Sequence, residues 1–172
     1  GGSGSDSFEF NSYGLTSAAL SGNQDNDTFR LTGPTVETTI WGGKGEDSVQ
    51  LRNTLTNSYI YANSGNDTID VTAAVQGSYI NAGQGDDRFS PTGTVTDSTL
   101  VGGSGADLLT FNNSVVNASI AGASAGGTTD TANDTVVFSS TANDVNVSFA
   151  EGTDSLSFAK GATNATVAAA GS

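Results

Sequence analysis

Large apolar residues recur along this chain at a fixed interval of 20 positions, with polar residues between them. One such series consists of Ile40, Ile60, Ile80, Leu100 and Ile120. Stretches of alternating polar and apolar residues accompany the series, as in residues 48–51 and 58–62. Self-similarity at a fixed period indicates equivalent structural units, each stacked on its neighbours.

Each 20-residue unit contains the signals of two strands and two turns. The alternation in residues 48–51 predicts a half-buried strand, and residues 58–62 predict a second strand with Ser58, Ile60 and Ala62 facing inward. A polar turn separates the two strands, and a glycine-rich turn leads to the next unit. This leaves no room for a helical crossover. The pattern therefore predicts an all-β fold, a right-handed parallel β-roll or β-solenoid with about eight coils of 20 residues and two short strands per coil. Eight hairpins in an ordinary sandwich are the alternative, but a sandwich does not require equal loop lengths.

Aspartates mark the start of each coil at the same interval. Asp27, Asp47, Asp67, Asp87 and Asp107 are 20 positions apart. The series extends back to Asp6, with one extra residue before Asp27, and forward to Asp134 and Asp154. The step from Asp107 to Asp134 is 27 positions, which predicts an insertion at about 123–130. We therefore interpret 1–172 as a single solenoid segment, with regular coils over 1–122 and degenerate coils over 131–172.

The charge of the chain narrows the classes of function. Five basic and 18 acidic residues give a formal net charge of −13. Such a charge disfavours nucleic acids and anionic membranes as partners and favours cations. The chain has no Cys and no His, so the usual ligands of zinc and haem and the usual base of triad catalysis are absent. No apolar run is long enough to insert into a membrane.

The turn before each of the first six aspartates has a common composition. These turns read GGSGSD, GNQDND, GGKGED, ANSGND, AGQGDD and GGSGAD. All of their second and fourth positions hold Gly, Asn or Asp, which adopt a left-handed backbone at little cost. Together with the residues that follow, as in GGSGADLLT, the motif resembles the GGxGxDxUx repeat of the RTX (repeats-in-toxin) calcium-binding parallel β-roll, as a variant with 20-residue coils.

The RTX resemblance implies a row of Ca²⁺ sites. In that family, backbone carbonyls and Asp carboxylates of successive turns hold Ca²⁺, a cation that takes six to eight oxygen ligands. The implied metal ligands here are Asp6, Asp27, Asp47, Asp67, Asp87 and Asp107.

Electrostatics provide a separate argument for cations. Equivalent carboxylates in a parallel stack would lie roughly 4.8 Å apart and repel by about 3 kcal/mol per pair at an effective dielectric of about 20. A divalent cation would offset this repulsion. The alternative is that the aspartates cap their turns by accepting backbone N–H bonds.

Four aromatic residues are expected on the outer face of the second strands. Trp41 and Tyr61 share one predicted column, and Tyr59 and Tyr79 share the adjacent one. Exposed aromatic patches often contact glycans or other proteins, although strand propensity and cross-strand pairing also explain them.

No pair of carboxylates has the unequal environments that acid–base catalysis needs, so we expect no enzyme activity. The expected function is a non-catalytic, calcium-stabilised β-roll segment of a larger secreted or surface-displayed structural protein, of S-layer or adhesin type. One alternative is a module that recognises glycans or a subunit, for example in a phage fibre, through Trp41, Tyr59, Tyr61 and Tyr79. Another is the calcium-binding secretion tail of an extracellular hydrolase. The expected location is extracellular, on a bacterial cell surface or alternatively a virion. Since the chain lacks an initiator Met and begins inside a motif, it is expected to be part of a longer protein.

Overall fold

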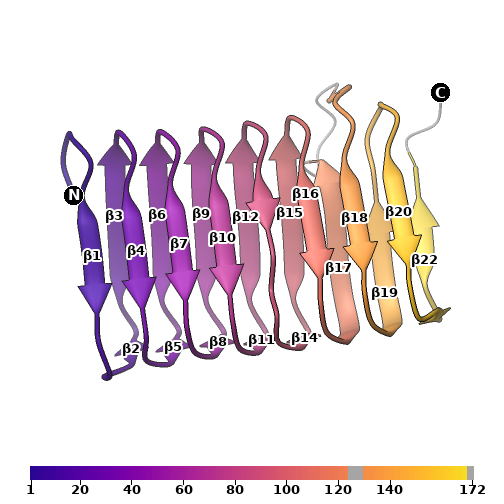
Figure 1. Ribbon diagram of the computed structural model, residues 1–172, viewed down its shortest axis with the longest axis horizontal. Coiled ribbons are helices and arrows are strands. Elements are labelled where there is room, and N and C mark those ends of the chain that lie inside the picture. The colour runs from indigo at the N-terminus through magenta and orange to yellow at the C-terminus, as the bar shows by residue number, and fades with distance from the viewer. Residues whose placement is uncertain (124–129, 170–172) are drawn as a thin grey trace.

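The computed structural model describes residues 1–123 and 130–169 of the chain, which wind into a parallel β-solenoid (Figure 1). All strand pairs are parallel, and the described residues contain no helix. In Figure 1 the front strands run downward and the rear strands upward while the chain advances from left to right, so the coils are right-handed. The predicted fold is therefore confirmed.

One side of the solenoid is a sheet of eight strands, one from each coil. Its strands are β1 (Ser7–Phe10), β4 (Thr28–Leu31), β7 (Ser48–Leu51), β10 (Thr68–Val71), β13 (Arg88–Phe89), β16 (Leu108–Phe111), β18 (Thr135–Phe138) and β20 (Ser155–Phe158). Neighbouring strands pair in register with the 20-residue repeat, as with Val49 and Ile69. Strand β13 is shorter than the others and ends before Pro91, which has no backbone N–H to donate.

The other side is a 14-stranded sheet in which most coils contribute a long strand and a two-residue strand. The long strands are β3 (Ala19–Gln24), β6 (Thr39–Lys44), β9 (Tyr59–Ser64), β12 (Tyr79–Gln84), β15 (Thr99–Ser104), β17 (Val115–Ala123), β19 (Ala142–Ser148) and β22 (Thr166–Ala168). The two-residue strands are β2 (Leu15–Thr16), β5 (Thr35–Val36), β8 (Leu55–Thr56), β11 (Val75–Gln76), β14 (Val95–Thr96) and β21 (Ala162–Thr163). The sequence pattern did not predict these two-residue strands, because two residues are too few to show alternation.

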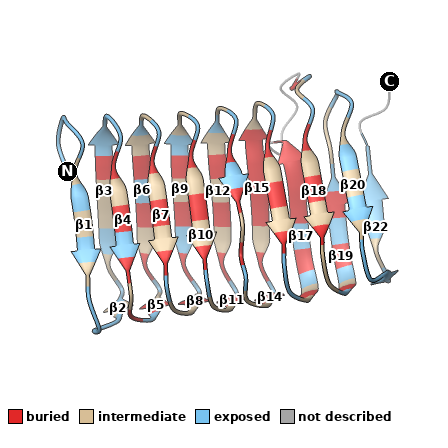
Figure 2. Cartoon of the chain, viewed as in Figure 1, coloured by how far each residue is buried: buried red, intermediate tan, exposed pale blue. Residues whose placement is uncertain are grey.

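The core is an apolar seam between the two sheets. Ile60 and its equivalents Ile40 and Ile80 are buried in consecutive coils, as the period predicts. Leu55 and Val75, which follow the aspartates by eight positions, are also fully buried and close the lower end of the seam. The middle coils are well buried, whereas β1, β20 and β22 at the two ends are largely exposed (Figure 2).

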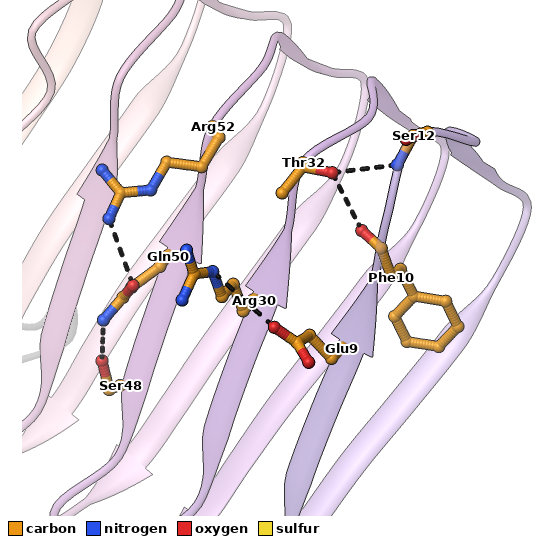
Figure 3. Close-up of polar contacts among 8 residues, drawn as sticks. All are labelled: Glu9, Phe10, Ser12, Arg30, Thr32, Ser48, Gln50 and Arg52. Atoms are coloured by element: carbon orange, nitrogen blue, oxygen red, sulfur yellow. Dashed lines mark hydrogen bonds and ion pairs between the residues drawn. The ribbon is translucent and has the colours of Figure 1, made fainter.

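The outer face of the eight-stranded sheet carries polar side chains that contact one another within and between coils (Figure 3). Arg30 Nε lies 3.9 Å from Glu9 Oε1 on the preceding coil, and both side chains are about half exposed. Arg52 donates a 3.3 Å hydrogen bond to Gln50 Oε1. Exposed contacts of this kind contribute little to stability, so the seam and the backbone ladders hold the fold together.

The 20-residue register changes at two points of the stack. Ser7 of β1 pairs with Thr28 of β4, a step of 21 positions. Leu108 of β16 pairs with Thr135 of β18, a step of 27 positions where the neighbouring pairs are 20 apart. The insertion predicted at about 123–130 falls mainly on residues 124–129, which lie outside the described residues. Residues 170–172 lie outside them too. Within the described parts, no helix is long and apolar enough to cross a membrane.

Candidate metal site in the aspartate column

The glycine-rich turns stack along the upper edge of the solenoid in Figure 1, between each long strand and the first strand of the next coil. Their backbones are left-handed at two positions, for example at Asn63 (φ 81°) and Gly65 (φ 127°). A Cβ built on Gly65 would overlap the carbonyl oxygen of Gly45 in the preceding coil. The glycines therefore permit both the turn and the close stacking of one turn on the next.

The aspartates that close these turns form one column, which we call the aspartate column. It contains the six predicted residues, Asp6, Asp27, Asp47, Asp67, Asp87 and Asp107, and continues through Asp134 and Asp154. All its members from Asp27 to Asp134 are buried, with 1–3% of each residue exposed. The structure thus brings together every residue predicted as a metal ligand.

A hydrogen-bond ladder joins each aspartate to the next coil. The backbone N–H of Asp27 donates to Asp47 Oδ1 (2.8 Å), and that of Asp47 donates to Asp67 Oδ1 (2.7 Å). The same bond recurs from Asp6 to Asp154, with lengths of 2.7–3.0 Å. The aspartates do accept backbone N–H bonds, as the capping alternative proposes, but the donors to Oδ1 belong to the preceding coil.

The second carboxylate oxygen of these residues has no partner. Oδ2 is buried, and no group of the described residues donates a hydrogen bond to it, in Asp27, Asp47, Asp67, Asp87 and Asp107. Asp6 differs, because it is half-buried and its Oδ2 accepts a 2.8 Å bond from the backbone N–H of Gly2. A buried oxygen that no donor satisfies is unfavourable and points to a proton or a cation at that position.

Three of these Oδ2 atoms, those of Asp27, Asp47 and Asp107, lie close to a backbone carbonyl oxygen of the next coil. Before Asp67 and Asp87, the buried Ala62 and Ala82 occupy the equivalent position. A Cβ built on Gly22 would overlap both Asp27 Oδ2 and the carbonyl oxygen of Gly42. The same pair of oxygens, Asp107 Oδ2 and the Gly122 carbonyl, surrounds the Cβ position of Gly102. The turns thus direct carboxylate and carbonyl oxygens toward a common region.

Burial shifts the pKa of five column carboxyls upward, those of Asp47, Asp67, Asp87, Asp107 and Asp134. Desolvation raises the pKa of Asp67 to about 8, although the hydrogen bond from the Asp47 backbone lowers it, and the neighbouring carboxylates Asp87 and Asp47 raise it further. The same main cause raises the pKa of Asp107 to about 8 and that of Asp87 to about 7. For Asp47 and Asp134 the pKa rises to about 6. The charged form of the column is therefore disfavoured unless a cation accompanies it.

Sequence reasoning missed one acidic residue near the column. Asp130 is 9% exposed, its Oδ1 accepts a 3.1 Å bond from the Ala132 backbone, and its buried Oδ2 has no partner among the described residues. Its charge helps raise the pKa of Asp107 and Asp134. Asp130 lies outside the 20-residue register, so the repeat contained no signal for it.

The column does not assemble a site from acidic side chains alone. The described residues contain no group of three or more Asp or Glu side chains placed to hold one metal ion. A cation bound here would therefore take most of its ligands from backbone carbonyls and water.

A second hydrogen-bond ladder, which is made of hydroxyls, lies at the other edge of the solenoid, where each two-residue strand leads into the long strand of the same coil. The backbone N–H of Thr38 donates to Ser58 Oγ, and that of Ser58 donates to Ser78 Oγ, each over 3.1 Å. The ladder continues to Ser98, and each hydroxyl also donates to a carbonyl two residues before it, as from Ser58 to Thr56 (2.8 Å). These buried hydroxyls use both donor and acceptor, unlike the aspartates. The sequence had marked Ser58 only as a small inward residue.

The four predicted aromatic residues, Trp41, Tyr59, Tyr61 and Tyr79, meet on the outer face of the 14-stranded sheet. We call them the aromatic patch. Tyr61 pairs with Trp41 on one side, and Tyr59 pairs with Tyr79, as the columns predicted. The ring centroid of Tyr61 lies 6.4 Å from that of Tyr59 and 5.7 Å from that of Tyr79.

Fold and site together define a parallel β-solenoid with a buried aspartate column. No protein-family model, curated protein or solved structure matches the chain. The resemblance to RTX β-rolls consequently rests on the turn motifs, and calcium binding stays a prediction.

Proposed function

We propose that this chain is a non-catalytic structural segment of a larger secreted or surface-displayed protein, in which Ca²⁺ compensates the aspartate column. The observation that carries the proposal is the run of five consecutive carboxylates with a buried, unpartnered Oδ2. The ion pair of Arg30 with Glu9 lies on the outer face of the eight-stranded sheet, so Arg30 does not neutralise the buried carboxylates of this column.

The available donors suit Ca²⁺ in their chemistry. Carboxylate and carbonyl oxygens are the ligands that hard cations prefer, and Ca²⁺ tolerates the irregular geometry that turns and water provide. The residues that would hold the ion are Asp27, Asp47, Asp67, Asp87 and Asp107, through Oδ2. Asp6 is the weakest of the six predicted ligands, because its Oδ2 already accepts a bond from Gly2.

A structural role agrees with the rest of the molecule. The aspartates occupy equivalent positions, so no two of them are differentiated as acid and base, and a repeated stack with a rigid seam is typical of extended scaffolds. A cation at every turn would couple neighbouring coils and make the stack more stable in calcium-rich surroundings, as outside a cell.

The test is a calcium titration of the chelated chain at pH 8.5, followed by circular dichroism and thermal melting. This pH is above the raised pKa values of the column, so protons compete less with the cation than at neutral pH. We expect Ca²⁺ to raise the melting temperature or to restore β signal, since the free energy of metal binding adds to that of folding. Equal melting with Ca²⁺ and with chelator would contradict the proposal and leave a proton-compensated hydrogen-bond ladder.

A further inference from the structure

A depression of about 420 Å³ lies beside the aromatic patch, on the outer face of the 14-stranded sheet. Its walls come from β9, β12 and β15, and seven residues line it: Tyr61, Asn63, Ser64, Asn81, Gly83, Gln84 and Ser104. A volume of a few hundred cubic ångströms falls in the range of small-molecule sites. Tyr61 belongs to both the patch and the depression.

Strand register explains both the hollow and its aromatic wall. Tyr61 pairs with Asn81, and Asn63 pairs with Gly83, so a glycine stands where a side chain would otherwise fill the surface. Gly103 continues the glycine row on β15. The large ring of Tyr61 consequently stands next to an open space on the same face.

The lining offers neutral hydrogen-bonding groups. Asn63 donates a 3.0 Å bond to the Tyr61 carbonyl, which orients its amide. Asn81 Oδ1 is buried and has no hydrogen-bond partner among the described residues, although Asn81 faces the depression. A buried amide oxygen without a donor is unfavourable, so rotation of the Asn81 amide toward the depression, where a ligand hydroxyl can donate to it, would relieve this cost. None of the seven lining residues carries a charge.

We propose that the aromatic patch and this depression form a binding site for a neutral oligosaccharide. A sugar ring has an apolar face, which packs on an exposed aromatic ring, and hydroxyls that both donate and accept hydrogen bonds. Amide, hydroxyl and phenol groups have the same dual capacity. Tyr59 is 49% exposed and its ring centroid lies 6.4 Å from that of Tyr61, so it offers a second aromatic surface beside the depression.

Charge argues against the other classes of ligand. An anionic glycan would meet a chain of net charge −13 and a lining without Lys or Arg, and a cationic ligand would find no carboxylate in the lining. A protein partner needs a broad surface, whereas here one hollow is edged by a few rings.

The experiment measures binding of defined hexasaccharides. The probes are β-1,4-linked glucose, β-1,4-linked N-acetylglucosamine and α-1,4-linked glucose, with oligogalacturonate as the anionic arm. Titrations are followed by tryptophan fluorescence, because Trp41 is the sole tryptophan of the chain and lies in the patch. We expect saturable binding of at least one neutral hexasaccharide and roughly tenfold weaker binding by Tyr61→Ala and by Asn81→Ala.

Tyr13→Ala is the matched control, because Tyr13 is 87% exposed and lies outside the patch and the lining. All variants are first compared with the wild type by circular dichroism and thermal melting. The saccharide titrations are then carried out both with Ca²⁺ and with chelator. The fold of the wild type in chelator is checked separately. This separates a failure of saccharide binding from a failure of the calcium proposal. The inference is overturned if no neutral probe binds, if oligogalacturonate alone binds, or if Tyr61→Ala binds as the wild type does. It is also overturned if sedimentation shows that Tyr59→Ala dissociates a self-associated form held through the patch.

Discussion

The backbone N–H of Asp47 donates a 2.7 Å hydrogen bond to Oδ1 of Asp67, the equivalent residue one coil further on. The bond leaves Asp67 Oδ2 buried with no partner among the described residues. One carboxylate thus has two roles, because Oδ1 joins two coils while Oδ2 is open to a cation or a proton. A mutation can remove the role of Oδ2 while keeping the hydrogen bond to Oδ1.

Asp67→Asn keeps an acceptor for the Asp47 N–H and removes the charge. At pH 8.5 with chelator we expect the variant to melt at or above the wild-type temperature, since a buried charge is lost. In Ca²⁺ we expect it to gain less stability than the wild type, because the sites on both sides of this turn lose a ligand. Thermal melts with a calcium titration check both expectations.

Asp154→Asn is the matched control for that change. Asp154 accepts the last ladder bond, from Asp134, but lies in an end coil and is only half-buried. A larger calcium deficit in Asp154→Asn than in Asp67→Asn would contradict the assignment of the ion row.

Calcium-free stability should fall as pH rises. The folded-state pKa values of Asp47, Asp87 and Asp67 are raised to about 6, 7 and 8 from an ordinary value of 3.8. Between these limits the folded state binds more protons than the unfolded state, so the stabilisation is complete below about pH 4 and is lost as pH rises through 6–8. We expect the melting temperature of the chelated chain to drop between pH 5 and pH 8.5. A rise over this window would show that the column is ionised at little cost.

Gly85→Ala should destabilise the stack by roughly 1–3 kcal/mol. Gly85 has φ 124°, and an added Cβ would overlap the carbonyl oxygen of Gly65 in the preceding coil. Gly2→Ala is the control, because nothing lies within 4 Å of its Cβ position. Denaturant unfolding of both variants measures the difference, and equal stability would mean that the turns do not stack as closely as described.

Ser58→Ala should cost about 1–3 kcal/mol, because it leaves the buried N–H of Thr38 without its acceptor. Ser119→Ala removes the same hydroxyl from an exposed position on β17 and should be nearly neutral. Chemical denaturation compares the two, and a neutral Ser58→Ala would show that the hydroxyl ladder adds nothing to stability.

The sequence determined the fold to a large extent. The interval of 20 equals one coil, so residues such as Ile60 and Ile80 had to stack, and the same interval assembled the aspartate column and the aromatic patch. Alternation in residues 48–51 correctly assigned the inward side chains. These features are repeated in each coil, and repetition is visible without a structure.

Only the tertiary structure decided which atoms of these residues have partners. That Asp67 Oδ1 is bonded and Oδ2 is not depends on how one turn sits on the next, and the register alone does not contain this offset. The pairing of Asn63 with Gly83 follows from the interval of 20, but only the structure shows that it leaves a hollow beside Tyr61. The repeat period identifies the features that all coils have in common. The proposed binding sites depend instead on differences between stacked coils and on polar atoms that have no partner.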